Sequence, residues 1–275
     1  MTDACRDHLP PGILRRLNSV VDRGHHEELR WRLRQRREAR RDASRRVQAD
    51  AAGGLPFAHA IATEDPRIVQ FGGYRTSAQR LQDVFVRIMA AKSGLSSYLE
   101  IGGADPVNLS NTYLLESEEG WSGVSVELDP ELAGRHSGVR RSPCLVLDAT
   151  VADYAEILAS HLGEGDVGYL SLDIDPAHQS LNALAQLPLQ NRRFAVVTFE
   201  HDAYRVGRGV RGVSRQILSH FGYELVIADV ENDGLSFEDW WVHPALIPRE
   251  TWAQYQASHA DPAEILWQKR SSWTG

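Results

Sequence analysis

Short apolar runs and longer segments with helical spacing alternate along most of the chain, and together they predict an α/β protein. The runs that predict strands are 97–101, 124–127, 144–147, 167–174, 194–199, 223–228 and 238–242. Apolar strands separated by helices are typical of a parallel sheet that is covered on both faces. The last two runs flank the turn sequence Asn232-Asp233-Gly234. We therefore expect a Rossmann-like, seven-stranded, mostly parallel sheet with an antiparallel hairpin at its edge.

The first 74 residues follow a different pattern. Residues 12–49 have few helix breakers, with apolar positions near the front and almost wholly polar positions behind, which predicts a helical arm. Residues 55–74 are rich in turn residues and are expected to form a loop, after which Ser77 is a candidate N-cap for a helix that ends near Gly94. The predicted division is an N-terminal helical arm and loop over 1–74 and a main domain over 75–275.

Composition places the chain among ordinary globular proteins. Apolar residues make up 42% and charged residues 24% of its 275 positions. The sequence lacks the roughly 18-residue apolar run of a membrane-spanning helix, and residues 1–11 lack the apolar core of a secretory signal. The two cysteines, Cys5 and Cys144, are far apart and suggest neither a disulfide framework nor a zinc knuckle. These features favour a cytoplasmic protein.

Charge is distributed unevenly along the sequence. The net charge is −7, yet residues 11–50 hold twelve arginines and six acids, so this segment carries +6 and the remainder −13. A basic arm can bind the phosphates of a nucleic acid, which gives one alternative function. However, acids interleaved with the arginines can pair with them one turn away, and the acidic remainder would repel a polyanion. A solvated helix, or one that joins copies of the chain into a homo-oligomer, is the favoured interpretation of the arm.

Three successive predicted strands end in a carboxylate. Glu100 closes the first of these strands and is followed by Gly102 and Gly103, Glu127 closes the second, and Asp148 closes the third. Ligands of open α/β sheets bind beyond the carboxyl ends of the strands, where glycines let the backbone approach closely. A carboxylate in the position of Glu127 can accept two hydrogen bonds from a ribose, and one in the position of Asp148 can accept from an adenine amino group. The pattern therefore predicts an adenosine-binding site.

The turn after the first strand distinguishes two adenosine-containing cofactors. Ala104, Asp105 and Pro106 follow the two glycines, so the phosphate-binding pattern GxGxxG is absent. Asp105 would repel a pyrophosphate, and Pro106 lacks the backbone N–H that could bind one. A ligand without phosphates and with a positive sulfur suits this acidic turn better. The sequence therefore favours S-adenosyl-L-methionine (SAM) over NAD, with Glu100, Gly102, Gly103, Asp105, Glu127 and Asp148 as its candidate binding residues.

Residues 98–127 resemble the FkbM-type methyltransferases. The resemblance rests on Glu100-Ile101-Gly102, Ser110-Asn111-Thr112, Gly120-Trp121-Ser122-Gly123 and Glu127, with weaker similarity at 170–175 and 199–201. It implies a class I methyltransferase fold, SAM as methyl donor, and O-methylation of sugars or secondary metabolites. The best-matching positions are Glu100, Gly102, Glu127 and Asp173. Pro106 stands where many relatives have glycine and Asp175 where glycine is usual, so the shape of these loops is expected to differ.

Residues after the fourth and fifth strands of the main sheet are candidates for the chemistry. The fourth strand ends in Asp173-Ile174-Asp175 and the fifth in Glu200-His201-Asp202. O-methylation requires a hydroxyl to lose its proton, and a histidine of near-neutral pKa such as His201 is a candidate base, with Asp173 beside it. Alternatively, Asp173, Asp175, Glu200 and Asp202 could hold a Mg²⁺ ion that acidifies the hydroxyl. A structural role, with Asp173 capping a helix and Glu200 pairing with an arginine, is the competing interpretation.

A second enzyme class accounts for part of the same pattern. In a metal-dependent glycosyltransferase, Asp173 and Asp175 would form an acid-x-acid motif that binds a metal and the phosphates of a nucleotide-sugar. That interpretation leaves Glu100, Gly102 and Glu127 unexplained. Heat stabilisation by SAM but not by UDP-sugars would separate the two classes, because a ligand stabilises only the state it binds. The prediction is a SAM-dependent O-methyltransferase acting on a small-molecule acceptor.

Overall fold

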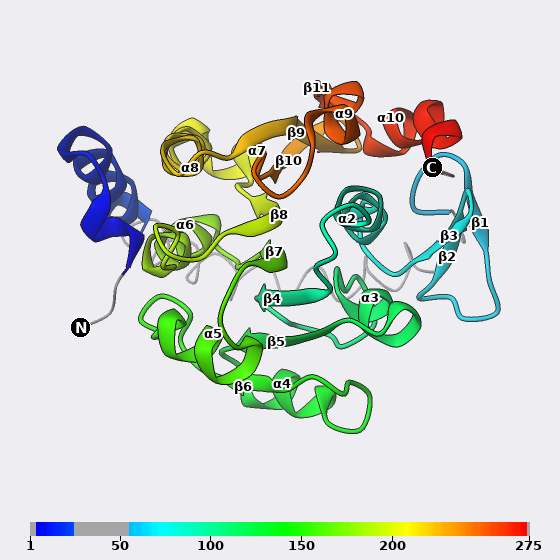
Figure 1. The fold of residues 1–275 in the computed structure, drawn as a ribbon, viewed down its shortest axis with the longest axis horizontal. Coiled ribbons are helices and arrows are strands. Elements are labelled where there is room, and N and C mark those ends of the chain that lie inside the picture. Colours follow the sequence, from blue (N-terminus) through cyan, green and yellow to red (C-terminus); the bar gives the residue numbers. More distant parts are fainter. Residues whose placement is uncertain (1–3, 25–54, 274–275) are drawn as a thin grey trace, which may run out of the picture.

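A computed structural model describes residues 4–24 and 55–273. Its centre is an eight-stranded sheet in the order β11-β9-β10-β8-β7-β4-β5-β6 (Figure 1). Five strands are parallel neighbours: β6 (Cys144–Val146), β5 (Ser122–Glu127), β4 (Ser97–Ile101), β7 (Val167–Leu172) and β8 (Phe194–Glu200). This arrangement confirms the predicted Rossmann-like α/β fold with a mostly parallel sheet.

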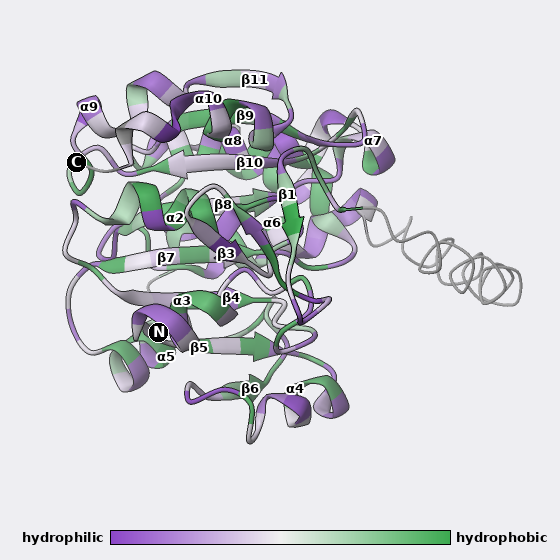
Figure 2. Ribbon diagram, turned by 90° about the vertical axis from the view of Figure 1, so that its right-hand side faces the viewer, coloured by the Kyte–Doolittle hydropathy of each residue, from purple (hydrophilic) through white to green (hydrophobic). Residues whose placement is uncertain are grey.

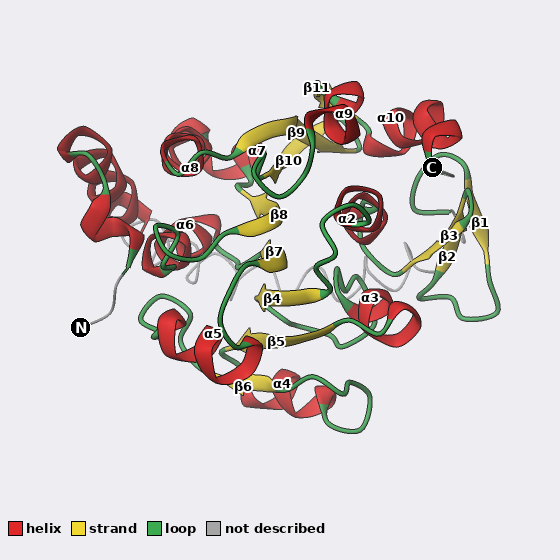
Figure 3. Cartoon of the chain, viewed as in Figure 1, coloured by secondary structure: helices red, strands yellow, loops and turns green. Residues whose placement is uncertain are grey.

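Helices cover both faces of the sheet, as Figure 3 shows. One face carries α5 (Tyr154–Leu162), α6 (Ala177–Gln186) and α8 (Arg208–His220). The other carries α2 (Gln82–Ala90) and α3 (Tyr113–Glu119), while α4 (Pro130–His136) packs near the β6 edge. Between sheet and helices lie two clusters of buried apolar side chains. The strands are apolar because both of their faces are buried, and β8 accordingly carries mainly the hydrophobic colour in Figure 2.

The predicted hairpin exists, but it does not form the edge of the sheet. β10 (Leu235–Val242) is antiparallel to its neighbours and lies between β8 and β9 (Glu224–Asn232). The outer side of β9 is paired in parallel with β11 (Ala257–Ala260), so the sheet has eight strands where seven were expected. The sequence of β11 is short and half polar, which is why no apolar run marked it as a strand.

The segment that was expected to be a loop contains a second, three-stranded antiparallel sheet. Its strands are β1 (Ala60–Ala62), β2 (Val69–Phe71) and β3 (Tyr74–Thr76). Phe71 is fully buried, and its ring packs edge-on against Trp267 of α10 (Pro262–Lys269) and close to Trp273. Strands of three residues are too short to show a period, and this small sheet depends on aromatic partners from the other end of the chain.

The helix after this sheet begins later than predicted. Its N-cap is Leu81, not Ser77. The Ser77 hydroxyl instead donates a hydrogen bond to the carbonyl of Ser110, and its backbone N–H donates to Asp83. Ser77 therefore links the segment before α2 to the loop before α3, and such a tertiary contact cannot be predicted from the local sequence.

The N-terminal helix runs from 11 to 24 in the described part of the chain. Its residue Leu17 and the preceding Cys5 and Leu9 are buried in the same apolar cluster as α6 and α8. Residues 25–49 of the predicted arm lie outside the described residues. Among the helices that are described, none combines the length and the apolar character needed to cross a bilayer.

Candidate functional site

The order of the strands reverses between β4 and β7, and the turn after β4 lies against the end of β7. Gly102 has a φ of 92°, and a Cβ atom there would come within 1.8 Å of the Asp173 carbonyl oxygen. Only glycine permits this approach, because any side chain would displace the end of β7. A crevice at such a reversal is where open α/β sheets bind their ligands.

Two adjoining cavities open at this point. The larger, of about 730 Å³, reaches from Gly102 across the ends of β5 and β6 to Asp148. The smaller, of about 260 Å³, extends from Gly102 toward Asn111 at the start of α3. Gly102, Ala104 and Asp173 line both cavities. The two are therefore lobes of one cleft, and a ligand that fills both has its middle beside Asp173.

The larger lobe combines two carboxylates with apolar walls. Glu127 accepts hydrogen bonds from the backbone N–H groups of Ala104 at 3.0 Å and Asp129 at 2.9 Å, which fixes its carboxylate while leaving lone pairs on both oxygens. Asp148 uses one oxygen for the N–H and hydroxyl of Thr150. The Leu128 and Leu147 side chains line the same lobe with exposed fractions of 66% and 39%. Such exposed leucines beside fixed acceptors suit a flat ring with polar edges.

Glu100 lies in the smaller lobe, but its carboxylate is already engaged by the protein. It accepts hydrogen bonds from the hydroxyls of Thr112 at 2.8 Å and Ser125 at 2.7 Å, and a guanidinium nitrogen of Arg140 lies 4.0 Å away. Arg140 also donates to Thr112 at 2.9 Å. Glu100 therefore ties β4, β5 and the start of α3 together behind the lobe.

Asn111, which lines the smaller lobe, has a buried acceptor without a partner among the described residues. The side-chain amide of Asn111 donates to the Ser171 hydroxyl at 3.1 Å, while its carbonyl oxygen has no hydrogen bond among the described residues. Asn111 is buried and lines this lobe. A buried acceptor that lacks a donor is costly, so this oxygen would gain from a ligand N–H once the side chain turned it toward the lobe.

The turn that follows Gly102 is contacted by a buried histidine of α4. His136 of α4 is buried, and its Nε2 lies 3.2 Å from the carbonyl oxygens of both Gly103 and Ala104. Asp105 accepts from the backbone N–H groups of Val107 and Asn108, which closes a tight turn at the rim of the smaller lobe. The structure thus gives Gly103 and Asp105 places in the wall of the cleft.

Asp173 and Glu200, at the ends of β7 and β8, are neighbouring carboxyl groups that influence each other's ionisation. Burial raises the pKa of Asp173, and the neighbouring charge of Asp175 adds to the rise. Burial and the charge of Asp173 together hold the pKa of Glu200 well above its usual range. Both side chains line the larger lobe. Both shifts favour the protonated form of these carboxyls relative to ordinary acids.

The two remaining acids of the predicted metal set are partly neutralised. A guanidinium nitrogen of Arg205 lies 2.9 Å from Asp175 and 3.3 Å from Asp202. Asp173, Asp175, Glu200 and Asp202 do not bring oxygens to one common point in the described structure, where the one convergent group of possible metal ligands is His201, Asp229 and Asp239. That group is itself bound by arginines, since Arg215 donates to both Asp229 and Asp239.

His201 does not face the cleft. Its side chain is fully buried, its Nδ1 accepts the backbone N–H of Ala203 at 3.1 Å, and its Nε2 lies 3.5 Å from Asp239 and 3.7 Å from Asp229. Both ring nitrogens therefore point at protein groups. His201 lines neither lobe of the cleft, which argues against its predicted role as the base.

The cleft holds the strand-end residues that the sequence pattern singled out, together with residues that the pattern did not indicate. Glu127 and Asp148 lie together in the larger lobe, Glu100, Gly103 and Asp105 in the smaller, and Gly102 and Asp173 in both. Asn111, Leu128 and Leu147 were not predicted as site residues. Leu128 and Leu147 directly adjoin the strand-end acids, so an apolar residue next to each acid was the signal that could have found them.

Comparison with known proteins finds likeness in structure only. No protein-family model matches the sequence, and no curated protein is similar to it. An O-methyltransferase from Bacillus cereus in complex with SAH is 17% identical, with 72% of this chain and 88% of that chain covered and a TM-score of 0.41. The N-terminal domain of EvdMO1, determined in the presence of SAH and D-fucose, is 15% identical over 73% of this chain and 96% of that chain, with a TM-score of 0.38.

A third similar structure is the magnesium protoporphyrin IX methyltransferase (ChlM) from Synechocystis PCC 6803 with bound SAM. It is 12% identical over 59% of this chain and 77% of that chain, with a TM-score of 0.39. All three TM-scores lie below 0.5, so we assign the fold from the sheet order and pairing described above.

Proposed function

We propose that the protein is a SAM-dependent methyltransferase that methylates an oxygen of a small molecule, such as a sugar or a secondary metabolite. The observation that carries this proposal is the two-lobed cleft at the reversal of strand order. One lobe joins fixed carboxylates to exposed leucines, and the other is lined by Asn111, whose carbonyl oxygen has no partner among the described residues. The resemblance of residues 98–127 to FkbM-type methyltransferases supports the same activity.

The hydrogen-bond acceptors and apolar walls of the cleft fit SAM. Glu127 offers acceptors for a ribose diol, Asp148 keeps one oxygen for an adenine amino group, and Leu128 and Leu147 provide apolar walls for the ring. The Asn111 carbonyl oxygen and the acidic surroundings of the smaller lobe suit the ammonium group of the methionine part. When bound, SAM supplies an electrophilic methyl group carried by a positive sulfur.

The carboxyl pair supplies the proton acceptor in place of His201. A hydroxyl of the methyl acceptor beside Glu200 would pass its proton to the ionised member of the Asp173–Glu200 pair, while bound SAM would supply the methyl group, its S–CH3 bond breaking so that SAH leaves. A carboxylate of raised pKa is a stronger base than an ordinary one. Asp173, which lines both lobes, also places negative charge at the middle of the cleft, where the positive sulfur is expected.

A divalent cation is the second candidate for activating the hydroxyl. Carboxylates at the ends of β7 and β8 are oxygen ligands of the kind Mg²⁺ prefers, and a cation would compensate the charge of Asp173, which together with burial raises the pKa of Glu200. Ligation requires the side chains to move, because their oxygens do not converge in the described structure. Loss of turnover on chelation, with recovery on adding Mg²⁺, would favour the cation over the carboxyl pair.

The deciding experiment is methyl transfer from labelled SAM to a panel of sugars and secondary metabolites, with and without Mg²⁺. Binding is tested separately by thermal unfolding with SAM, SAH or UDP-sugars. We expect SAM and SAH to raise the unfolding temperature and UDP-sugars to leave it unchanged. Stabilisation by UDP-sugars but not by SAM would refute the proposal and favour a glycosyltransferase.

A further inference from the structure

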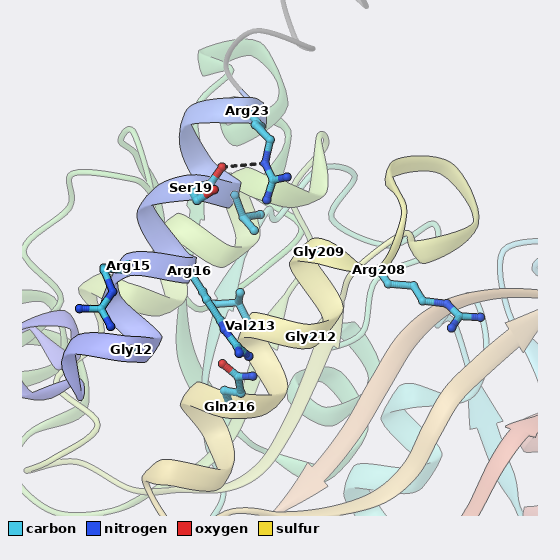
Figure 4. A pocket seen from close by; sticks show the side chains of 11 residues that line it. Gly12, Arg15, Arg16, Ser19, Arg23, Arg208, Gly209, Gly212, Val213 and Gln216 are labelled. Atoms are coloured by element: carbon cyan, nitrogen blue, oxygen red, sulfur yellow. Dashed lines mark hydrogen bonds between the residues drawn. The ribbon is translucent and has the colours of Figure 1, made fainter.

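A second hollow lies on the far side of α8, away from the cleft. It is a groove of about 490 Å³ between the helix over 11–24 and α8, and none of its lining residues also lines the cleft (Figure 4). Arg16 and Arg23 extend from the N-terminal helix along the groove, as Figure 4 shows. Arg15 and Arg208 lie at its two sides. The groove is therefore lined by four arginines.

Among the described residues, no acidic side chain lines the groove. Neither Arg16 nor Arg23 forms an ion pair with any of these residues, and Arg23 donates from its Nε to the Ser19 carbonyl at 3.0 Å. The core-facing arginines of α8 differ, because Arg211 and Arg215 both bind the buried Asp229. The described part of the chain thus neutralises these inner arginines and provides no acid for the arginines along the groove.

The floor of the groove leaves room for a ligand. A Cβ atom added at Gly12 or Gly212 would meet no atom within 4 Å, so the backbone of both helices is open there. Val20 and Val213 form an apolar base, and the Gln216 side chain lies beside Arg16 in Figure 4. The volume falls within the range of small-molecule sites, which is roughly 300–1,000 Å³.

We propose that this groove binds a phosphate-bearing ligand through Arg16 and Arg23. A guanidinium presents paired N–H donors that match two phosphate oxygens, and several unpaired arginines around one hollow favour an anion with more than one charge. No aromatic residue is found among the described residues that line the groove. Proteins that bind single-stranded nucleic acids stack the bases on aromatic rings, so a small phosphorylated molecule fits this groove better than an RNA strand. The site is independent of the proposed methyltransferase activity.

The test is calorimetric titration of inorganic pyrophosphate into the full chain at low salt. We expect Arg16→Gln/Arg23→Gln to weaken binding about tenfold or more, which corresponds to at least about 1.4 kcal/mol. Arg16→Lys/Arg23→Lys keeps the charge but loses the paired donors, and its affinity should fall between the two. The matched control, Arg249→Gln/Arg270→Gln, removes two exposed arginines elsewhere and should bind as the unmodified chain does.

Folding and competing ligands are checked in the same series. Arg16 and Arg23 are exposed, so the double glutamine variant should unfold at the same temperature as the unmodified chain. Saturating SAH should leave the pyrophosphate affinity unchanged, because no residue lines both sites. The proposal is overturned if the unmodified chain does not bind pyrophosphate, if Arg16→Gln/Arg23→Gln binds it equally well, or if a short single-stranded RNA binds where pyrophosphate does not.

Discussion

The Nε2 atom of His201 lies 3.5 Å from a carboxylate oxygen of Asp239, and both side chains are buried. The pairing orients the imidazole so that its Nδ1 can accept the N–H of Ala203, which begins α7 (Ala203–Val206). Glu200 precedes His201, and Asp202 follows it. The contact therefore holds the end of β8 and the start of α7, and His201 is a positioning residue for the acidic side of the cleft.

Replacing His201 should separate positioning from proton transfer. His201→Ala removes the acceptor for the Ala203 N–H and should lower both stability, by about 1–3 kcal/mol, and kcat. His201→Asn offers an oxygen near the place of Nδ1 and should recover part of both losses. The pH profile of methyl transfer should keep its shape in each variant. A change in its acid limb, measured with labelled SAM, would return His201 to the role of base.

Removing the fixed acceptors of the larger lobe should weaken SAM binding. Glu127→Gln and Asp148→Asn each lose a charged acceptor, and we expect each dissociation constant to rise about tenfold to a hundredfold in calorimetry. Glu131→Gln is the matched control, since Glu131 is an exposed neighbour on α4 that does not line the cleft. Equal affinity of all three variants would show that the adenosine part binds elsewhere.

Glu200→Gln tests the proton acceptor directly. The amide cannot take up a proton, so kcat should fall about a hundredfold or more while SAM affinity changes little. Glu224→Gln, an exposed change at the start of β9, serves as the control. Unchanged turnover with Glu200→Gln at every pH would exclude the carboxyl pair as the base.

Glu238 should make stability depend on pH. Burial raises its pKa to about 8, even though Gln82 and Trp240 donate hydrogen bonds to it. The unfolded chain releases this proton near its ordinary pKa, so the protonated carboxyl stabilises the fold fully at low pH and the contribution is lost as pH rises through about 8. Glu238→Gln should be more stable than the unmodified chain above pH 8, by about 3 kcal/mol. Denaturant unfolding at several pH values, with Glu250→Gln as control, measures this; parallel curves would disprove it.

Arg215 should be needed for folding. It donates two hydrogen bonds to Asp239 and lies 2.9 Å from Asp229, so Arg215→Gln leaves buried carboxylates short of a partner and should cost about 3 kcal/mol. Burial acts to raise the pKa of Asp239, but hydrogen bonds from Arg215 and His201 outweigh it and hold this pKa at about 2. The stabilisation is therefore present above pH 4 and is lost as pH falls through about 2.

Urea unfolding at neutral pH and in acid measures both effects of the Arg215 change. Arg193→Gln, which breaks an exposed pair with Asp166, is the control and should cost much less. If the two arginine variants lost the same free energy of unfolding, the buried cluster would contribute nothing beyond a surface ion pair.

The acids at the strand ends could be predicted from the sequence, because each lies directly beside an apolar run. Glu127 and Asp148 directly follow apolar runs, and parallel strands bring such ends to one edge, so their meeting in one lobe follows from topology alone. The orientation of His201 was not predictable, since it depends on β10 being inserted antiparallel beside β8, which brings Asp239 next to Phe199. The contacts that occupy the Glu100 carboxylate could not be predicted either, because Thr112, Ser125 and Arg140 come from three separate segments.

The parallel pairing of β11 with β9 has a consequence for how the protein behaves at high concentration. An uncovered β9 would present a nine-residue row of backbone donors and acceptors to other chains. β11 occupies that row over Ala257–Ala260, and the opposite border ends in β6, which has only three residues. Neither border offers a long template for strand addition, so the terminal segment protects the sheet against edge-to-edge aggregation.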